Sequence, residues 1–189
     1  MKGFVSVALA AVLGIGTVYA DETTYKKEGI GYIKMLGGAL KKELKRHLKH
    51  DPSGLEALAF CSGSAERITQ EVNAKLPKGV RVYRTALKVR NAKANTPDKT
   101  DIEVMKSYEK AISEGKAIDK EIRIVDTNDH VRVYKPLVTK PVCLKCHGSA
   151  LDPKVAEGIK HAYPDDKATG FKVGDLRGVI VAEMPKAQH

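Results

Sequence analysis

The chain has 189 residues, with 33 Lys and Arg against 23 Asp and Glu, a formal net charge of +10, three cysteines and no tryptophan. This length is sufficient for one domain with a buried core. Its lysines are spread along the chain and only 5% of its residues are aromatic, which argues against a nucleic-acid-binding protein. The basic balance suits an acidic partner or an anionic membrane surface, although a solvated protein surface would also explain it.

Residues 1–20 have the features of a secretory signal peptide. Lys2 supplies a positive start, Phe4 to Val18 is apolar and contains two glycines, and Val18-Tyr19-Ala20 ends in a small residue. We therefore expect cleavage after Ala20 and a periplasmic location. An uncleaved membrane anchor is the alternative, but the apolar run is short for a membrane span.

Residues 25–50 carry a helical pattern in which Lys and Arg fill the positions between regularly spaced apolar residues. Those apolar residues recur at intervals of three and four: Ile33, Leu36, Leu40, Leu44 and Leu48. We expect residues 21–50 to form an N-terminal amphipathic helix that packs on the rest of the chain. A basic helix of this kind can also lie on a membrane or pair with a second copy, and both alternatives stay open.

A second helix is predicted from Asp51 to about Lys75, because aspartate suits an N-cap and Pro52 suits the first helical position. Cys61 falls on its buried face, and the small residues that follow it weaken the helix but leave room for a flat group. A free cysteine is often buried simply as a small hydrophobic residue. Cys61 is therefore a candidate ligand with that alternative open. The other residues of this face are Leu58, Ala65, Ile68 and Val72.

The rest of the chain lacks the strand–helix–strand alternation of a parallel sheet. Strands are predicted over residues 80–87, 121–126, 131–137 and 179–181, with the second and third forming a hairpin. One helix is predicted to be capped by Thr100 or Asp101 and to run to about Ser113, and a short one to run from Asp152 to about His161. This order predicts an α+β domain over residues 51–189, in which N-terminal helices pack on an antiparallel sheet.

The stretch Cys143-Leu144-Lys145-Cys146-His147 is the attachment pattern of c-type haem. Each thiol adds across a haem vinyl group to give a thioether, and the adjacent imidazole can bind the iron. A zinc site would need a second close pair of ligands, and a dithiol redox motif normally opens a helix, whereas Pro141 and Gly148 frame a loop. A structural disulfide is a further alternative. We expect one covalent haem, attached at Cys143 and Cys146 and bound through iron by His147.

The pattern leaves open the ligand on the other face of the iron. A methionine would raise the reduction potential, as in many electron carriers, whereas a thiolate would lower it. Binding to iron would also hold the thiol deprotonated. The candidates are Met105, Met184, His130, His161 and Cys61.

Several groups of residues between Leu55 and Val181 share a pattern with one known family. They are Arg84-Thr85, Leu87-Lys88 and Arg90-Asn91; Asn95 and Pro97-Asp98; Pro141 to Gly148; and Tyr163-Pro164-Asp165-Asp166, Ala168, Gly170-Phe171, Gly174-Asp175 and Arg177-Gly178. With them the chain resembles the PAS-like c-type haem domains, once described only as a domain of unknown function. Members occur as single-domain exported cytochromes and as sensory domains of signalling proteins, and this chain resembles the stand-alone form. The loop around residues 93–94 departs from the family, whose loop is richer in proline.

The resemblance implies a PAS-like sheet with one haem held against it. It also implies a cysteine in the early helix as the second axial ligand, at the position of Cys61. Guanidinium groups suit haem propionates, although ion pairing with an aspartate such as Asp165 or Asp175 is an alternative. The arginines in the matched segments are Arg84, Arg90 and Arg177.

We expect a periplasmic monohaem c-type cytochrome that transfers electrons or senses redox state. The alternative is a haem-based sensor or binding protein for NO or CO, in which Cys61 leaves the iron on reduction because a thiol binds ferrous iron weakly. An enzyme such as a peroxidase is not expected, because nothing pairs His130 or His161 with an acid–base partner. The expected partners are an acidic redox protein, a small gas and a second copy bound through the N-terminal helix.

Overall fold

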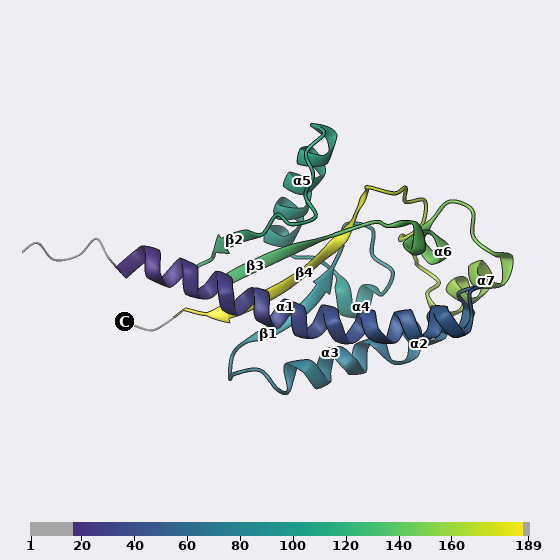
Figure 1. The fold of residues 1–189 in the computed structure, drawn as a ribbon, viewed down its shortest axis with the longest axis horizontal. Coiled ribbons are helices and arrows are strands. Elements are labelled where there is room, and N and C mark those ends of the chain that lie inside the picture. Colours follow the sequence, from purple (N-terminus) through teal and green to yellow (C-terminus); the bar gives the residue numbers. More distant parts are fainter. Residues whose placement is uncertain (1–16, 187–189) are drawn as a thin grey trace, which may run out of the picture.

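A computed structural model describes residues 17–186, with side chains from Glu22 onward (Figure 1). The predicted signal peptide lies outside the described residues except for residues 17–20, so its cleavage stays a prediction. The elements are α1 (Thr17–His50), α2 (Leu55–Gly63), α3 (Ala65–Asn73), β1 (Arg81–Thr85), α4 (Ala92–Asn95), α5 (Lys99–Ser113), β2 (Arg123–Asp126), β3 (His130–Val138), a 3-10 turn η1 (Pro141–Cys143), α6 (Leu144–His147), α7 (Pro153–Ala162) and β4 (Leu176–Pro185). None of these described helices combines the length and apolar character needed to cross a bilayer.

The four strands form one antiparallel sheet in the order β1-β4-β3-β2. β4 is central and extends well beyond the predicted strand over residues 179–181. Its residues from Val179 to Met184 are all buried, because helices cover both faces of the sheet. The predicted α+β class, with N-terminal helices on an antiparallel sheet, is confirmed.

One face of the sheet is covered by α1, which lies across it in Figure 1. Ile33 and Leu36 are fully buried against strand residues that include Val133 and Ile180. Each such side chain stabilises the fold by about 1.5–3 kcal/mol through burial. The helix can approach this closely because a Cβ atom on Gly29 would lie 2.6 Å from Val133 Cγ2. The first part of the predicted apolar stripe therefore serves the core, with Leu40 partly buried against it, whereas Leu44 and Leu48 are only half-buried.

The opposite face is covered by α5, whose Met105 and Tyr108 are fully buried against β3 and β4. This helix is capped by Asp98 and not by Thr100 or Asp101 as predicted. The Asp98 side chain accepts a hydrogen bond from the Asp101 amide, and the Asp101 carboxylate accepts one from the Asp98 amide. That reciprocal pair satisfies two amide groups that otherwise lack partners at a helix start.

The single helix predicted over residues 51–75 is wrong in two places. Asp51 and Pro52 belong to a turn, and α2 begins only at Leu55, after Gly54 in the left-handed region at φ 96°. The helix then breaks at Ser64, whose φ of −126° is not helical, and continues as α3. The weak helix formers Ser62, Gly63 and Ser64 explain the break.

Candidate cofactor-binding site

The Cys143–His147 segment follows β3 and lies beyond one end of the sheet, with α7 nearby (Figure 1). Although a loop was predicted, η1 and α6 form two short helical turns that start at Pro141. Cys143 and Cys146 are free and partly buried, and their i, i+3 spacing favours one side of the helical turn. Gly148 ends α6: its amide donates to the Leu144 carbonyl, from which a Cβ atom at Gly148 would lie only 2.7 Å away.

His147 is held in one orientation and one tautomer. Its Nδ1 lies 2.7 Å from the Ala168 carbonyl oxygen, which can only accept, so Nδ1 carries the proton and Nε2 keeps its lone pair. Burial, together with the charges of Arg177 and Arg90, lowers the pKa of His147 to about 3. A neutral imidazole with an available Nε2 is the form that binds metals. The Nε–H group of Arg177 donates a hydrogen bond to that Nε2 at 3.4 Å, a contact that a metal at Nε2 would replace.

A second chain segment supports the motif through its backbone. The Gly170 amide donates to the Gly148 carbonyl at 3.0 Å, and the Phe171 amide donates to the His147 carbonyl at 2.9 Å. The ring of Phe171 also meets the imidazole edge-on, with ring centroids 6.2 Å apart. The orientation of His147 is therefore set by residues that follow it by about twenty positions.

Arg90 is committed to an ion pair. Its Nε and Nη2 atoms donate to the two Asp166 carboxylate oxygens at 3.1 Å each, and Nη2 also donates to the Cys146 carbonyl at 2.7 Å. The two side chains are only 10% and 7% exposed. The carboxylate that pairs with Arg90 thus belongs to Asp166, and not to Asp165 or Asp175, the two partners considered from the sequence. Arg90 therefore links the loop that follows β1 to the helical turn that contains Cys146.

Arg84 and Arg177 form no ion pair with any described residue. The Arg84 Nε atom is buried without a hydrogen-bond partner, and desolvation lowers the pKa of this guanidinium. Burial and the charge of Arg90 lower the pKa of Arg177 to about 10. Two half-buried cations without a carboxylate are costly unless an anion joins them. The donors present therefore fit a group that carries carboxylates.

Cys61 lies in the last turn of α2 and is exposed, so the prediction that it sits on the buried face is wrong. The break at Ser64 ends the helical register that would have aligned Cys61 with Ala65 and Val72, which are both buried. Desolvation, and then the nearby Cys146, raise the pKa of the Cys61 thiol.

The carbonyl of Cys61 is held by Tyr163, whose hydroxyl donates to it at 3.2 Å. Carbonyls in the last turn of a helix lack intrahelical partners, so this bond satisfies one of them. Tyr163 caps the C-terminus of α7, and α7 packs on α2 through Val155, Ile159 and Leu58. The helix that carries Cys61 is thereby fixed to the part of the chain that follows His147.

The other candidate ligands lie in the cores of the sheet, at its far end or on the exposed surface. Met105 and Met184 are fully buried in the two cores on opposite faces of the sheet. His130 starts β3, eight residues and roughly 26 Å before the strand end that leads to the motif. His161 is exposed on α7. No group of three or more His, Cys, Asp or Glu side chains within the described residues could hold a bare metal ion, which leaves the zinc interpretation without ligands there.

Sequence reasoning assigned no role to the Ala168 carbonyl, Tyr163, Asp166 or Phe171. All four belong to the long segment on which the family resemblance rests. That segment was the available signal, but a matched pattern cannot say which atom of each residue is used.

Comparisons with known proteins agree with this architecture. The family model described as "Tll0287-like: Tll0287" matches residues 17–185. A similar solved structure is the crystal structure of the cyanobacterial heme-protein Tll0287, with a TM-score of 0.59 and 21% identity over 92% of this chain and 99% of that one. A search of curated proteins found no match. At 21% identity, this structural similarity supports the fold alone.

Proposed function

The chain belongs to the Tll0287-like family, and from its site we propose that it is an exported monohaem c-type cytochrome that transfers electrons or senses redox state. The observation that carries the proposal is His147: directly after Cys143 and Cys146, its Nδ1 is engaged by Ala168 and its Nε2 keeps a lone pair. The similarity to a protein described as a heme-protein supports the same cofactor. When bound, haem supplies a one-electron iron couple.

Cys143 and Cys146 would attach the haem, each S–H adding across one vinyl group so that sulfur and hydrogen end on its two carbons. His147 would bind the iron, and Ala168 would keep its imidazole oriented. Cys61 would supply the iron's second protein ligand, because Tyr163 ties its helical turn to the chain segment that follows His147, whereas the methionines lie in the cores.

Arg84 and Arg177 are proposed to bind the propionates, since both lack an ion-pair partner among the described residues. Arg90 is assigned a supporting role because Asp166 already engages two of its nitrogen atoms. We propose no enzymatic role. A periplasmic location follows from the signal peptide predicted at residues 1–20.

Covalent attachment is tested by exporting the protein in a host that matures c-type cytochromes, denaturing it and staining for haem. A stained band at the chain's mass is expected, since thioether bonds survive denaturation. The variant Cys143→Ala/Cys146→Ala should give an unstained band of the same mass. An unstained wild-type band would refute the proposal.

A second candidate function is the reversible binding of NO or CO at the face of Cys61. The exposure of Cys61 and the helix break three residues later favour it, because the ligand could leave without disturbing a core. Adding CO to the reduced protein should then shift the absorption spectrum. An unchanged spectrum would favour electron transfer alone.

A further inference from the structure

The outward face of α1 carries a continuous line of positive charge that the haem proposal does not use. At successive spacings of four and three residues this face presents only lysine and glycine, and every one of these residues is exposed. We call this line the lysine ridge; it comprises Lys27, Gly31, Lys34, Gly38, Lys41, Lys45 and Lys49. It is about 33 Å long at 1.5 Å per residue.

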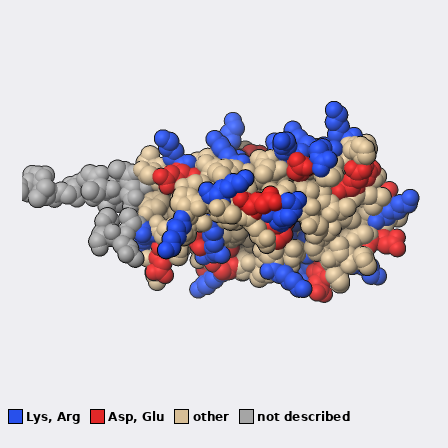
Figure 2. All heavy atoms as spheres, turned by 90° about the horizontal axis from the view of Figure 1, so that it is seen from below, with Lys and Arg blue, Asp and Glu red and all other residues tan. Residues whose placement is uncertain are grey.

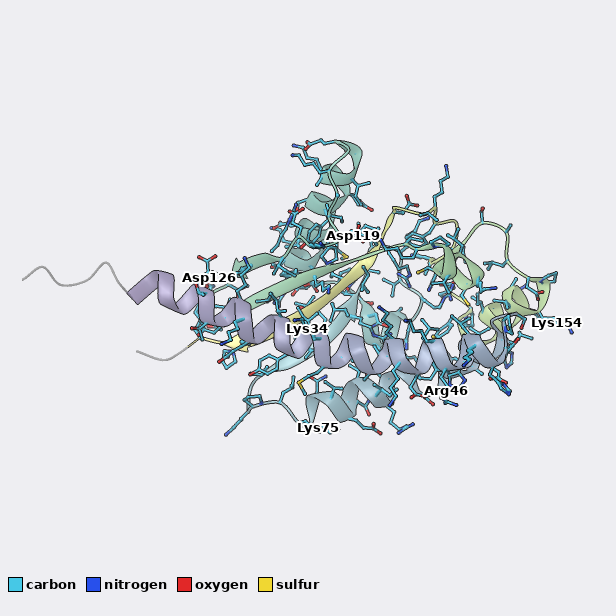
Figure 3. The ribbon with its side chains drawn as sticks, in the orientation of Figure 1. Lys34, Arg46, Lys75, Asp119, Asp126 and Lys154 are labelled. Carbon is cyan, nitrogen blue, oxygen red and sulfur yellow. The ribbon has the colours of Figure 1, made fainter. Side chains whose placement is uncertain are left out.

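The charges of the ridge are not neutralised within the described chain. None of its five lysines takes part in an ion pair between described residues. The acidic residues nearest in sequence are Glu28 and Glu43, and Glu43 pairs with Arg46 off the ridge. Figure 2 shows a row of Lys and Arg side chains projecting along one edge of the molecule, and Figure 3 labels Lys34 on α1.

Packing inside the chain does not explain this face. The apolar face of α1 is already used against the sheet through Ile33 and Leu36. By contrast, a Cβ atom on Gly31 or Gly38 would meet nothing within 4 Å. Each glycine weakens an exposed helix relative to alanine. Because glycine has no side chain, nothing projects from the backbone between the lysines that would hold a flat surface away.

We infer that the lysine ridge binds an anionic phospholipid surface. A straight row of single-sign charge complements a flat anionic plane. A second copy of this chain is disfavoured as the occupant, because it would set lysine against lysine. An acidic redox protein fits less well, because it must approach the Cys143–His147 turn, whereas most of the ridge runs along the sheet away from α6 (Figure 1). Met35, 42% exposed beside the ridge, adds apolar contact.

The inference does not depend on haem and is tested by co-sedimenting the purified protein with lipid vesicles. Vesicles of phosphatidylcholine and phosphatidylglycerol at 3:1 are compared with pure phosphatidylcholine, which measures any apolar binding of residues 1–20. Binding should be far stronger to the anionic vesicles. It should be lost at about 0.5 M NaCl, where the Debye length is below about 5 Å.

The variant K34E/K41E/K45E should lower the partition coefficient onto anionic vesicles by roughly 100-fold or more, because each lysine near the surface contributes about fivefold and the added glutamates are repelled. The matched control K106E/K120E/K154E makes the same net charge change at exposed lysines on α5, its following loop and α7. It should bind within a few-fold of wild type. Equal losses in the two variants, or equal wild-type binding to both vesicle types, would overturn the inference; circular dichroism verifies that both variants fold.

Discussion

The Nδ1 atom of His147 lies 2.7 Å from the carbonyl oxygen of Ala168, a residue 21 positions later in the chain. Because a carbonyl can only accept, this contact fixes the proton on Nδ1 and turns Nε2 away from it. The backbone hydrogen bonds that the Gly170 and Phe171 amides donate hold the same chain segment in place. Residues 163–178 therefore form the support for the Cys143–His147 motif.

Replacing the proposed second ligand should change the iron's coordination. We expect Cys61→Ala to alter the ferric absorption spectrum of the haem-loaded protein, because a thiolate that donates charge to iron is lost. Met184→Leu, made in the core beneath α1, should leave that spectrum unchanged. If the Cys61→Ala and wild-type spectra coincide, Cys61 is not a ligand.

Arg84 should raise the reduction potential of the haem. A positive charge beside the haem favours the reduced iron, which carries one positive charge fewer than the oxidised iron. Arg84→Gln should therefore lower the potential by an amount on the order of tens of millivolts in a spectroelectrochemical titration. Arg67→Gln, whose side chain is 64% exposed on α3, should shift the potential far less. An unchanged potential in Arg84→Gln would argue against a buried charge beside the haem.

Breaking the Arg90–Asp166 pair should destabilise the fold strongly, because each single change leaves its partner buried and unpaired. We expect Arg90→Gln and Asp166→Asn each to lower the free energy of unfolding by about 3–5 kcal/mol in urea. The double variant should lose less than the sum of the two. As a control, Arg67→Ala breaks an exposed pair with Glu71 and should cost under about 1 kcal/mol. Additive losses in the double variant would mean that the two side chains act independently.

Acid should weaken the fold partly through Glu183. Burial alone would raise the pKa of this carboxyl, but hydrogen bonds from Arg81 and Arg132, at 2.6 and 2.5 Å, outweigh burial and lower it. A carboxyl with a lowered folded-state pKa adds stability above its unfolded pKa of about 4.3, and that stability is lost as pH falls through the folded value.

Glu183→Gln should therefore be less stable than wild type at pH 7, by about 1–3 kcal/mol. Its free energy of unfolding should also fall less steeply between pH 5 and pH 3, as measured by urea denaturation at each pH. Above pH 6 the two curves should run parallel. Curves that stay parallel down to pH 3 would show that Glu183 does not carry the acid dependence.

Prediction from sequence succeeded where one local pattern determines the outcome. The three-and-four spacing of Ile33 and Leu36 predicted the buried face of α1 correctly. It failed where two local preferences compete: Asp51-Pro52 has the composition of a helix start, yet the turn before Leu55 uses the Asp51 carboxylate instead. The exposure of Cys61 was missed because the weak helix formers Ser62, Gly63 and Ser64 end the helix at a point where the apolar spacing alone predicts that it continues.

By itself, the sequence determined the covalent spacing of Cys143, Cys146 and His147 and the charged and apolar sides of α1, because these depend only on chain geometry and helical period. Tertiary structure alone decided which distant groups meet at the site. The antiparallel register that pairs Arg84 with Ile180 brings Arg177 to the Lys88 carbonyl, at 3.3 Å. Tertiary structure also decided that Asp166 neutralises Arg90 while Arg84 stays unpaired. An ion pair between residues 76 positions apart in the chain depends on how the loops pack and not on any local pattern.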